Sequence, residues 1–388
     1  MKVLHIITRL DKGGSAENVL ITCKGLNKKD DFEVVLVYGG ETRVDLGFKS
    51  YYIKELQREI SPIKDMIALF KILSVIKKER PDIVHTHSSK AGVLGRWATF
   101  FYNCKRIINY EFKKSKIVHT PHGHVFYGYY NFFKTMIFIL VEQITAKITD
   151  KLIALTEGER DESLRFGVGR REQWVIIHSG IDYKSRITNC KLKQEFNINN
   201  GELVIGTVAR LEPIKGIKYL IEAAKVVKES SSESKNYKFL IVGDGRERKK
   251  LEYLVSKLRL NDMVIFTGMR EDVVELMSIM DIYVQPSINE GMGKTIIMAQ
   301  MIGKPIVATT VQGIPSVVIN NETGILVLPK NAELLAEAIM KLSSNKELRE
   351  RFGKNAYLWT NKIVDGFPQF SKERMVLLLE GLYKNLVL

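Results

Sequence analysis

The sequence predicts an α/β protein of two doubly wound, parallel-sheet domains that face a cleft. Short β-branched runs alternate with longer amphipathic stretches, which is the pattern of parallel strands joined by crossover helices. The alternation occurs twice, on either side of a polar segment at 183–201 that has no strand pattern. The chain has 388 residues, more than the roughly 250–300 at which one hydrophobic core stops growing. Two domains are therefore expected.

The first domain is expected to span residues 1–183. Its strand candidates are KVLHIIT, FEVVLVYGG, PDIVHTHS, KIVHTPHG, KLIALT and WVIIHSG, with helical stretches at 15–28, 63–79 and 129–148. In doubly wound folds, ligands bind at the carboxyl ends of the strands.

The second domain is expected to span residues 201–367. Its strand candidates are LVIGTVARL, KFLIVGDG, VIFTGM, IYVQPS, PIVATT and GILVLP, and its helical stretches lie at 216–229, 246–258, 271–280, 294–302 and 331–343. The apolar spacing of the tail, 368–388, predicts a terminal helix that packs back on the first domain.

Composition excludes several protein classes. Hydrophobic residues make up 45% and charged residues 27%, as in ordinary globular proteins, so pervasive disorder is excluded. No apolar run is long enough to predict a transmembrane helix. Cys23, Cys104 and Cys190 are far apart and lack metal-ligand spacing, which fits a reducing cytoplasm.

The net charge of +15 indicates an anionic partner: nucleic acid, a membrane face or a phosphorylated substrate. The sequence contains none of the usual nucleic-acid recognition modules, so nucleic acid is not expected to be the partner.

Three familiar motifs fail. Gly291–Thr295 ends like a phosphate-binding loop, but the first glycine of that motif falls at Ile288. The pair Gly243 and Gly245 lacks the third dinucleotide-binding glycine and favours a plain strand-to-helix turn. No D-x-D triplet and no zinc-spaced cluster occurs, so no metal site is predicted.

All seven histidines precede residue 179, and most lie near the carboxyl end of a predicted strand. A lone histidine there is usually structural, whereas several at one rim favour a functional cleft. His122, which precedes Gly123 at a strand end, is the best placed to enter that cleft.

Other candidate site residues lie close to the ends of predicted strands. Gly13 and Gly14 precede a helix, where backbone N–H groups bind phosphate, although a turn also needs glycine. Arg210 and Lys215 share one loop and suit a diphosphate; the alternative is a solvated loop. Glu290 precedes a predicted helix, where a carboxylate also fits simple capping.

Jointly these motifs resemble the retaining, nucleotide-sugar-dependent glycosyltransferases of family 4 (group 1 type), which have two Rossmann-like domains in the GT-B architecture. The resemblance covers nearly the whole chain. It rests on GGSAEN, DIVHTHSSKAGVLGR, HTPHG, HSGID, GTVARLEPIKG, FLIVGDG, FTGMREDVVELMSIMDIYVQPSINEGMG and GKPIVATTVQGIPSVV, in that order.

The resemblance implies roles for particular residues. Arg210 and Lys215 match the pair that holds the donor diphosphate, and Gly14, next to Gly13, matches the glycine that approaches the phosphates. His122 matches the histidine near the transferred sugar, and Glu290 matches the first glutamate of the E-x7-E motif. The remaining matches form the phosphate-binding turn after Glu290: Gly291, Gly293, Lys294 and Thr295.

One position departs from the family pattern. The second glutamate, which accepts ribose hydroxyls, is Met298 here, and a thioether is a weak acceptor. Gln300 lies about 200° further around the helix and cannot simply replace it. Weaker ribose binding, a rearranged nucleotide contact, loss of activity and tolerated drift all remain open.

The resemblance implies transfer of a hexose or N-acetylhexosamine from a UDP- or GDP-sugar to a glycan or lipid-linked acceptor in cell-surface polysaccharide synthesis. No cofactor and no metal are expected, since cations and helix N–H groups stabilise the leaving diphosphate. Basic residues at 105–116 and aromatic residues at 125–140 predict peripheral contact of this cytoplasmic protein with the anionic inner face of the membrane. The alternatives are a nucleotide-sugar 2-epimerase and a catalytically silent sugar-nucleotide-binding partner.

Overall fold

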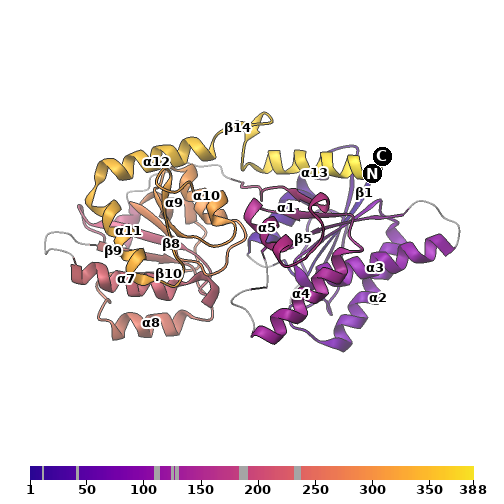
Figure 1. Ribbon diagram of the computed structural model, residues 1–388, viewed down its shortest axis with the longest axis horizontal. Helices are drawn as coiled ribbons and strands as arrows, with labels where there is room; N and C mark the ends of the chain where they lie inside the picture. The colour runs from indigo at the N-terminus through magenta and orange to yellow at the C-terminus, as the bar shows by residue number, and fades with distance from the viewer. Residues whose placement is uncertain are drawn as a thin grey trace. The chain divides into compact units, whose positions relative to one another are not determined.

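The computed structural model describes residues 1–10, 13–40, 43–108, 114–123, 126, 131–182, 191–230 and 237–388. They form two compact units (Figure 1). The first contains the described residues of Met1–Phe126, Tyr130–Gly180 and Ser371–Leu388, and the second those of Ile181–Phe370. Within these residues, no helix is long and apolar enough to cross a membrane.

The first unit is built on a seven-stranded sheet whose order is β3-β2-β1-β4-β5-β6-β7. All of its neighbouring strands are parallel. The strands are β1 (Lys2–Ile7), β2 (Glu33–Tyr38), β3 (Ser50–Tyr52), β4 (Ile83–His87), β5 (Lys116–Thr120), β6 (Lys151–Ala154) and β7 (Trp174–Ile176). The predicted strands are all present, and β3 is an additional short one.

Helices cover both faces of this sheet. One core joins the sheet to α1 and α13, and another joins it to α2 and α3. The helices are α1 (Gly14–Leu26), α2 (Pro62–Glu79), α3 (Ser89–Ile108), α4 (Phe132–Ala146), α5 (Glu157–Arg165) and α13 (Lys372–Val387). The terminal helix α13 buries Met375, Val376, Leu379 and Tyr383 in this unit.

The second unit is built on a six-stranded parallel sheet of order β10-β9-β8-β11-β12-β13. The strands are β8 (Leu203–Val208), β9 (Tyr237–Val242), β10 (Val264–Gly268), β11 (Ile282–Gln285), β12 (Ile306–Thr309) and β13 (Gly324–Val327). These are the six predicted strands, so the expectation of two parallel-sheet α/β domains is confirmed.

The helices of the second unit are α6 (Lys191–Glu195), α7 (Ile217–Ser230), α8 (Arg248–Lys257), α9 (Val273–Ser278), α10 (Lys294–Met301), α11 (Ala332–Ser344) and α12 (Lys346–Thr360). One large core joins α7, α8 and α11 to the sheet. A short hairpin of β14 (Ile363–Val364) and β15 (Phe367–Pro368) follows α12. Helix α6 begins inside the segment predicted as a polar linker, of which 183–190 lies outside the described residues.

Candidate functional site

The loop that follows β8 carries both predicted diphosphate cations. Arg210 is exposed, and its side chain makes no hydrogen bond or ion pair with the described residues. The loop backbone is held by Leu211 N–H, which donates to Asp244 O at 2.9 Å. A Cβ on Gly243 or Gly245 would lie 2.1 or 2.6 Å from a carbonyl of this loop. The two glycines therefore serve the close approach of two loops, and the strand-to-helix turn interpretation agrees with this geometry.

Lys215 ends the 3₁₀ turn Pro213–Lys215 and is brought to the loop after β11 by backbone contacts. Ile288 N–H donates to the carbonyl of Ile214 at 2.7 Å. A Cβ on Gly216, at φ 66°, would lie 1.9 Å from Pro286 O, so this approach requires glycine. The two loops are thereby fixed against each other.

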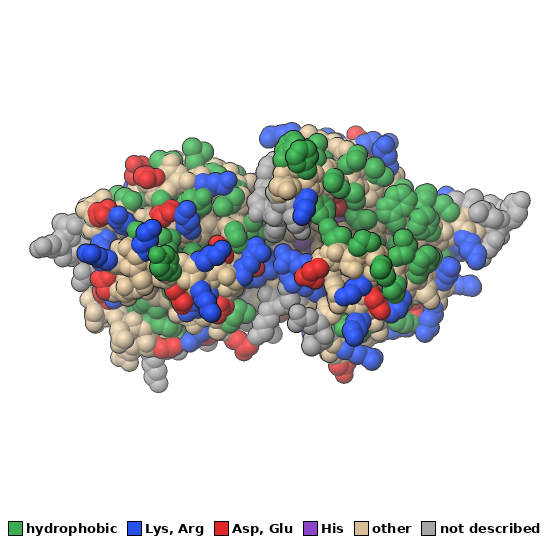
Figure 2. All heavy atoms as spheres, turned by 90° about the horizontal axis from the view of Figure 1, so that it is seen from below, with side chains coloured by type: hydrophobic (Ala, Val, Ile, Leu, Met, Phe, Trp, Pro, Cys, Tyr) green, Lys and Arg blue, Asp and Glu red, His purple; other side chains and the backbone are tan. Residues whose placement is uncertain are grey.

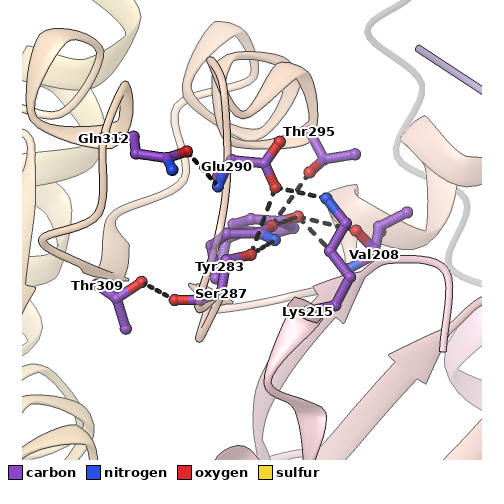
Figure 3. A network of polar contacts seen from close by, with 9 residues as sticks. Val208, Lys215, Tyr283, Ser287, Glu290, Thr295, Thr309 and Gln312 are labelled. Carbon is purple, nitrogen blue, oxygen red and sulfur yellow. Dashed lines mark hydrogen bonds and ion pairs between the residues drawn. The ribbon is translucent and has the colours of Figure 1, made fainter. Parts of the chain in front are cut away.

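Lys215 and Glu290 meet across these two loops, as Figure 3 shows. Lys215 Nζ lies 2.5 Å from Glu290 Oε2, and the side chains are 17% and 15% exposed. A charged pair that is mostly shielded from water interacts more strongly than a surface pair. The structure therefore brings together a predicted phosphate-binding cation and the predicted sugar-binding carboxylate.

A buried hydrogen-bond chain lies behind Glu290 (Figure 3). Tyr283 OH donates to Gln285 Oε1 at 2.9 Å, and Gln285 Nε2 donates to Ser287 Oγ at 2.8 Å. Ser287 Oγ donates to Glu290 Oε2 at 3.4 Å. Thr295 Oγ1 joins the chain through Gln285 Oε1 at 3.2 Å. The chain connects the core of the sheet to the carboxylate and to the first turn of α10.

Sequence reasoning missed Tyr283, Gln285 and Ser287. The signal was present: polar side chains at every second position of a strand share one face, and all three are at most 1% exposed. Buried polar side chains need hydrogen-bond partners, so their spacing predicts a connected network.

Gln312 is another residue that the sequence did not single out. It has a left-handed backbone at φ 38°, and its Oε1 accepts Glu290 N–H at 3.2 Å. Its buried Nε2 has no hydrogen-bond partner in the described part of the chain. Strained backbone and an unpaired buried donor are features of binding sites.

Helix α10 opens at Gly293, two residues after Gly291. Gly293 has φ 77°, and a Cβ there would lie 2.8 Å from Ile296 Cδ1. The N-cap residue Gly293 has no side chain that could cap the helix, and N–H groups around Lys294 and Thr295 lie at its electropositive end. This arrangement binds anions readily.

Met298 and Gln300 occupy different faces of α10. Met298 is half-buried, whereas Gln300 is fully buried, and Gln300 Nε2 donates to Thr323 Oγ1 at 3.2 Å. Gln300 therefore faces the protein interior and does not take the place of a glutamate at 298.

In the first unit, Gly13 is the N-cap of α1 and Gly14 is its first residue. Gly14 is exposed, and the N-cap residue Gly13 has no side chain that could cap the helix. Each unit thus has one predicted phosphate-binding helix that begins at glycine without a side-chain cap.

His122 lies in the turn after β5, with a left-handed backbone at φ 59°. His122 Nε2 lies 3.0 Å from His87 Nδ1. The next residue, Gly123, donates its N–H to Glu159 Oε1 at 2.7 Å, and Glu159 Oε2 accepts Leu155 N–H at 2.6 Å. Burial raises the pKa of Glu159 to about 7. No pattern in the sequence singles out this carboxylate, because it lies in an ordinary first helical turn.

A chain of histidines continues from His122 into the core. His87 Nε2 lies 3.0 Å from His5 Nδ1, and His85 Nδ1 lies 2.5 Å from Tyr383 OH on α13. Burial lowers the pKa of His5 to about 3 and lowers those of His85 and His87 well below their usual range. The rings are therefore neutral at physiological pH.

His5, His85 and His87 also offer ligand nitrogens within 4.8 Å of one another. Each of these rings hydrogen-bonds to a neighbour. The arrangement is that of a neutral, hydrogen-bonded cluster that ties β1, β4 and α13 together.

The predicted site residues thus fall into two groups. Lys215, Glu290 and Thr295 join one network in the second unit, with Arg210 on the same loop as Lys215. His122, Gly13 and Gly14 belong to the first unit, at ends of its parallel strands.

Comparisons with known proteins agree with this picture. The sequence pattern described as "Glycosyl transferases group 1" matches residues 189–359, and the one described as "Glycosyltransferase Family 4" matches residues 12–185. The chain is 30% identical to the UDP-Gal:alpha-D-GlcNAc-diphosphoundecaprenol alpha-1,3-galactosyltransferase of Escherichia coli, over 84% of this chain and 81% of that protein. It is 28% identical to the capsular polysaccharide biosynthesis glycosyltransferase CapM of Staphylococcus aureus, over 78% of each.

Solved structures show the same fold. HepE of Anabaena, solved with UDP and glucose, superposes with a TM-score of 0.80 at 19% identity and covers 99% of this chain and 100% of its own. Sucrose-phosphate synthase of Thermosynechococcus elongatus gives a TM-score of 0.80 at 22% identity, with 100% and 99% covered.

Proposed function

Because the chain belongs to the group 1 glycosyltransferases of GT-B fold, we propose that it transfers a hexose or N-acetylhexosamine from a UDP- or GDP-sugar, with retention of configuration. The acceptor is a glycan or a lipid-linked sugar in cell-surface polysaccharide synthesis. The Lys215–Glu290 pair carries the proposal, because it sets a diphosphate-binding cation beside a carboxylate that can accept sugar hydroxyls.

The donor diphosphate binds at the second unit. Arg210 and Lys215 supply positive charge from one loop, and the start of α10 at Gly293 supplies N–H groups around Lys294 and Thr295. The family resemblance assigns Gly14, at the glycine start of α1 in the first unit, a further contact with the phosphates. Helix N-termini and cations both stabilise phosphate.

Departure of the nucleoside diphosphate is the demanding step. Negative charge grows on the leaving phosphate, and preorganised cations and N–H groups act where that charge develops. Lys215 and Arg210 supply this stabilisation without requiring a metal. Retention then follows from attack by the acceptor on the face that the diphosphate leaves, with the leaving phosphate accepting the acceptor proton. Glu290 orients the sugar, and the family resemblance assigns His122, in the first unit, to the transferred sugar.

The names of the relatives support the choice of substrates. One relative is a UDP-galactose-dependent transferase acting on a diphosphoundecaprenol-linked sugar, and another serves capsular polysaccharide synthesis. HepE was solved with UDP and with UDP-glucose. A uridine nucleotide and a lipid-linked acceptor are therefore the first substrates to test.

A donor panel tests the proposal. UDP-, GDP- and ADP-sugars are screened by thermal shift, since a ligand that binds the native state raises the melting temperature. The best donor is then incubated with diphosphoundecaprenol-linked sugars, and the anomeric configuration of the product is read by NMR. We expect one nucleotide to stabilise the protein and a product with the donor's own configuration.

Two results would contradict the proposal. An inverted product would refute retention, and conversion of UDP-N-acetylglucosamine to its 2-epimer without any acceptor would favour the epimerase alternative. A protein that binds the nucleotide but gives no transfer with any donor and acceptor, even with glutamate restored at position 298, would favour the silent partner.

A further inference from the structure

Helix α2 exposes an apolar stripe to solvent. Ile63, Met66, Ile67 and Phe70 are 76%, 54%, 40% and 61% exposed. Their spacing of three and four residues places them on one helix face. The opposite face, with Ala68, Ile72, Val75 and Ile76, is buried against the sheet. The stripe therefore lies on the side of α2 that faces away from the core.

Helix α4 repeats the pattern. Phe133, Met136, Ile137 and Leu140 are 78%, 49%, 61% and 54% exposed, again at helical spacing. The helix buries Ile139, Glu142, Thr145 and Ala146 instead. In Figure 1, α2 and α4 lie at the lower edge of this unit. Figure 2 shows the molecule from below, and hydrophobic side chains gather on this side of the unit.

Helix α3 lies between them in sequence and packs against both. Arg96 on α3 and Glu142 on α4 form a buried ion pair at 2.7 Å, and α3 shares a core with α2. On α3, Phe101 is 46% exposed and stacks with Trp97 and Phe100, with ring centroids at 5.8 and 6.0 Å. The three helices thus present one layer with apolar side chains on its outer side. We call it the α2–α4 face.

The apolar part of this face lies toward the carboxyl end of the sheet. Each helix connects two parallel strands, so all three run opposite to the strands and parallel to each other. Their N-terminal halves, which carry Ile63 to Phe70 on α2 and Phe132 to Leu140 on α4, begin at the edge where β5 ends. His122 lies in the turn at that same edge.

The charges of the α2–α4 face favour an anionic partner. Besides the buried Arg96, the helices carry eight basic side chains: Lys64, Lys71, Lys77, Lys78, Lys90, Lys105, Arg106 and Lys134. Two of them form ion pairs, Lys71 with Glu55 and Lys90 with Asp65. The helices carry three acidic side chains, and all three form ion pairs: Asp65 with Lys90, Glu79 with Lys2 and Lys49, and Glu142 with Arg96. On these three helices, therefore, every carboxylate is ion-paired, and none is left to repel a negatively charged surface.

We propose that the α2–α4 face docks this protein on an anionic phospholipid bilayer, with the apolar stripes of α2 and α4 among the lipids and the lysines at the headgroups. Contiguous exposed apolar surface marks an interaction site, and aromatic and aliphatic side chains bordered by lysines suit the membrane interface. The inference rests on the proposed function in one respect: a lipid-linked acceptor would reach the edge of the sheet at His122 from the bilayer. Of the segments predicted for this contact, residues 109–113 of 105–116 and residues 125 and 127–130 of 125–140 lie outside the described residues. The α4 stripe falls within the second predicted segment, and the α2 stripe is a separate contribution.

Co-sedimentation with vesicles tests the docking. The full chain is mixed at low salt with vesicles of phosphatidylcholine alone or with an equal part of phosphatidylglycerol. We expect binding to the anionic vesicles, weakened by salt. The variant Phe70→Ser/Phe133→Ser should lower the partition coefficient by roughly tenfold or more, since each buried aromatic contributes appreciably to transfer. Its matched control, Tyr253→Ser/Leu358→Ser, removes two side chains of the second unit that are 71% and 57% exposed and should bind like the wild type.

A charge pair gives a second variant. Lys64→Glu/Lys134→Glu should abolish the preference for anionic vesicles, whereas Lys250→Glu/Lys346→Glu, which changes lysines of the second unit that are 81% and 80% exposed, should retain most of it. Absence of wild-type binding to anionic vesicles would overturn the proposal, as would equal binding of the wild type and the Phe70→Ser/Phe133→Ser variant.

A second copy of the chain is the competing occupant. If the wild type sediments as a dimer that Phe70→Ser/Phe133→Ser dissociates, and vesicles are not bound, the face is a protein interface and the proposal fails. Nucleotide-induced thermal shifts are measured on every variant. Unchanged shifts with lost vesicle binding would show that the donor site is intact, so failure of the docking remains separate from failure of the proposed function.

Discussion

Lys215 Nζ lies 2.5 Å from Glu290 Oε2, although the two residues are 75 positions apart in the chain. The glycine at 216 and the hydrogen bond from Ile288 N–H to Ile214 O hold the two loops together. The carboxylate partly neutralises the ammonium group and holds the lysine in place. A phosphate that binds here competes with Glu290 for Lys215.

This ion pair predicts that Glu290→Gln has different effects on UDP binding and on turnover. Removing the negative charge frees Lys215, so UDP should bind as tightly as in the wild type or more tightly. Turnover should fall by roughly a hundredfold, the size of effect seen when a group that stabilises the transition state is removed. Titration calorimetry gives the affinity, and a transfer assay gives kcat. A loss of UDP affinity with kcat unchanged would assign Glu290 to phosphate binding instead.

Met298→Glu should strengthen nucleotide binding. A carboxylate at this half-buried position of α10 can accept both ribose hydroxyls, and hydrogen bonds to charged groups contribute about 1.5–3 kcal/mol each. We expect the Kd for UDP to fall by roughly tenfold. Met298→Leu, which keeps the shape without any acceptor, serves as the control. Equal affinities for Met298→Glu and Met298→Leu would show that position 298 does not face the ribose.

Glu159 is predicted to be a positioning residue for His122. It accepts the N–H of Gly123, the residue after His122, and that of Leu155. Glu159→Gln keeps one acceptor and should lower kcat by roughly tenfold, with the affinity for UDP unchanged. The wild-type pH–rate profile should bend near pH 7, where Glu159 titrates, and the bend should be absent in the variant. Glu157→Gln, an exposed carboxylate of the same helix, is the control. If the bend persists in Glu159→Gln, another group is responsible for it.

The buried histidines predict acid instability of the first unit. Burial lowers the pKa of His5 from 6.5 to about 3, so its contribution to stability is present above pH 6.5 and is lost as the pH falls toward 3. At pH 5 this loss is about 2 kcal/mol for His5. His85, His87 and His119 shift in the same direction for the same reason. Glu159, with its raised pKa, opposes this loss, since its own contribution is lost as the pH rises through about 7.

Hydrogen exchange measured at pH 7.5 and pH 5 checks this prediction, with rates corrected for intrinsic chemistry. The second unit contains none of the seven histidines and is an internal control. Protection should fall in β1, β4 and β5 while that of β8 and β9 persists. Equal losses in both units would show that the histidines are not the cause.

Much of the fold was accessible from the sequence because buried parallel strands read as apolar, β-branched runs. Helix α3 was missed. Its first turns contain Gly92 and Gly95, which lower helix propensity. The structure gives the reason for them: a Cβ on Gly92 would lie 2.5 Å from the His119 ring, and one on Gly95 would lie 2.6 Å from Thr86. The glycines serve close helix–sheet packing, a tertiary requirement that local sequence does not reveal.

For the site, motif spacing placed Arg210, Lys215 and Glu290 on loops after strands, and the structure shows the last two in contact. The side chains that support Glu290 were not predicted. Gln285 and Ser287 read as strand and loop residues. Their hydrogen bonds are local, to Ser287 and Glu290, and the alternate spacing that indicated this network was not used. The α2–α4 face was missed in part for a related reason: an amphipathic helix pattern identifies two faces, but not whether the apolar face is the buried one.

Titration of UDP into matched variants tests the central claim that Arg210 and Lys215 bind the donor diphosphate. The wild type, Arg210→Ala, Lys215→Ala and Lys218→Ala are compared by calorimetry; Lys218 is 59% exposed beside the same loop and is the control. The account predicts that Arg210→Ala and Lys215→Ala each weaken UDP binding by roughly tenfold or more, the loss expected for a charged hydrogen bond, while Lys218→Ala binds like the wild type. Undiminished UDP affinity in both Arg210→Ala and Lys215→Ala would contradict it.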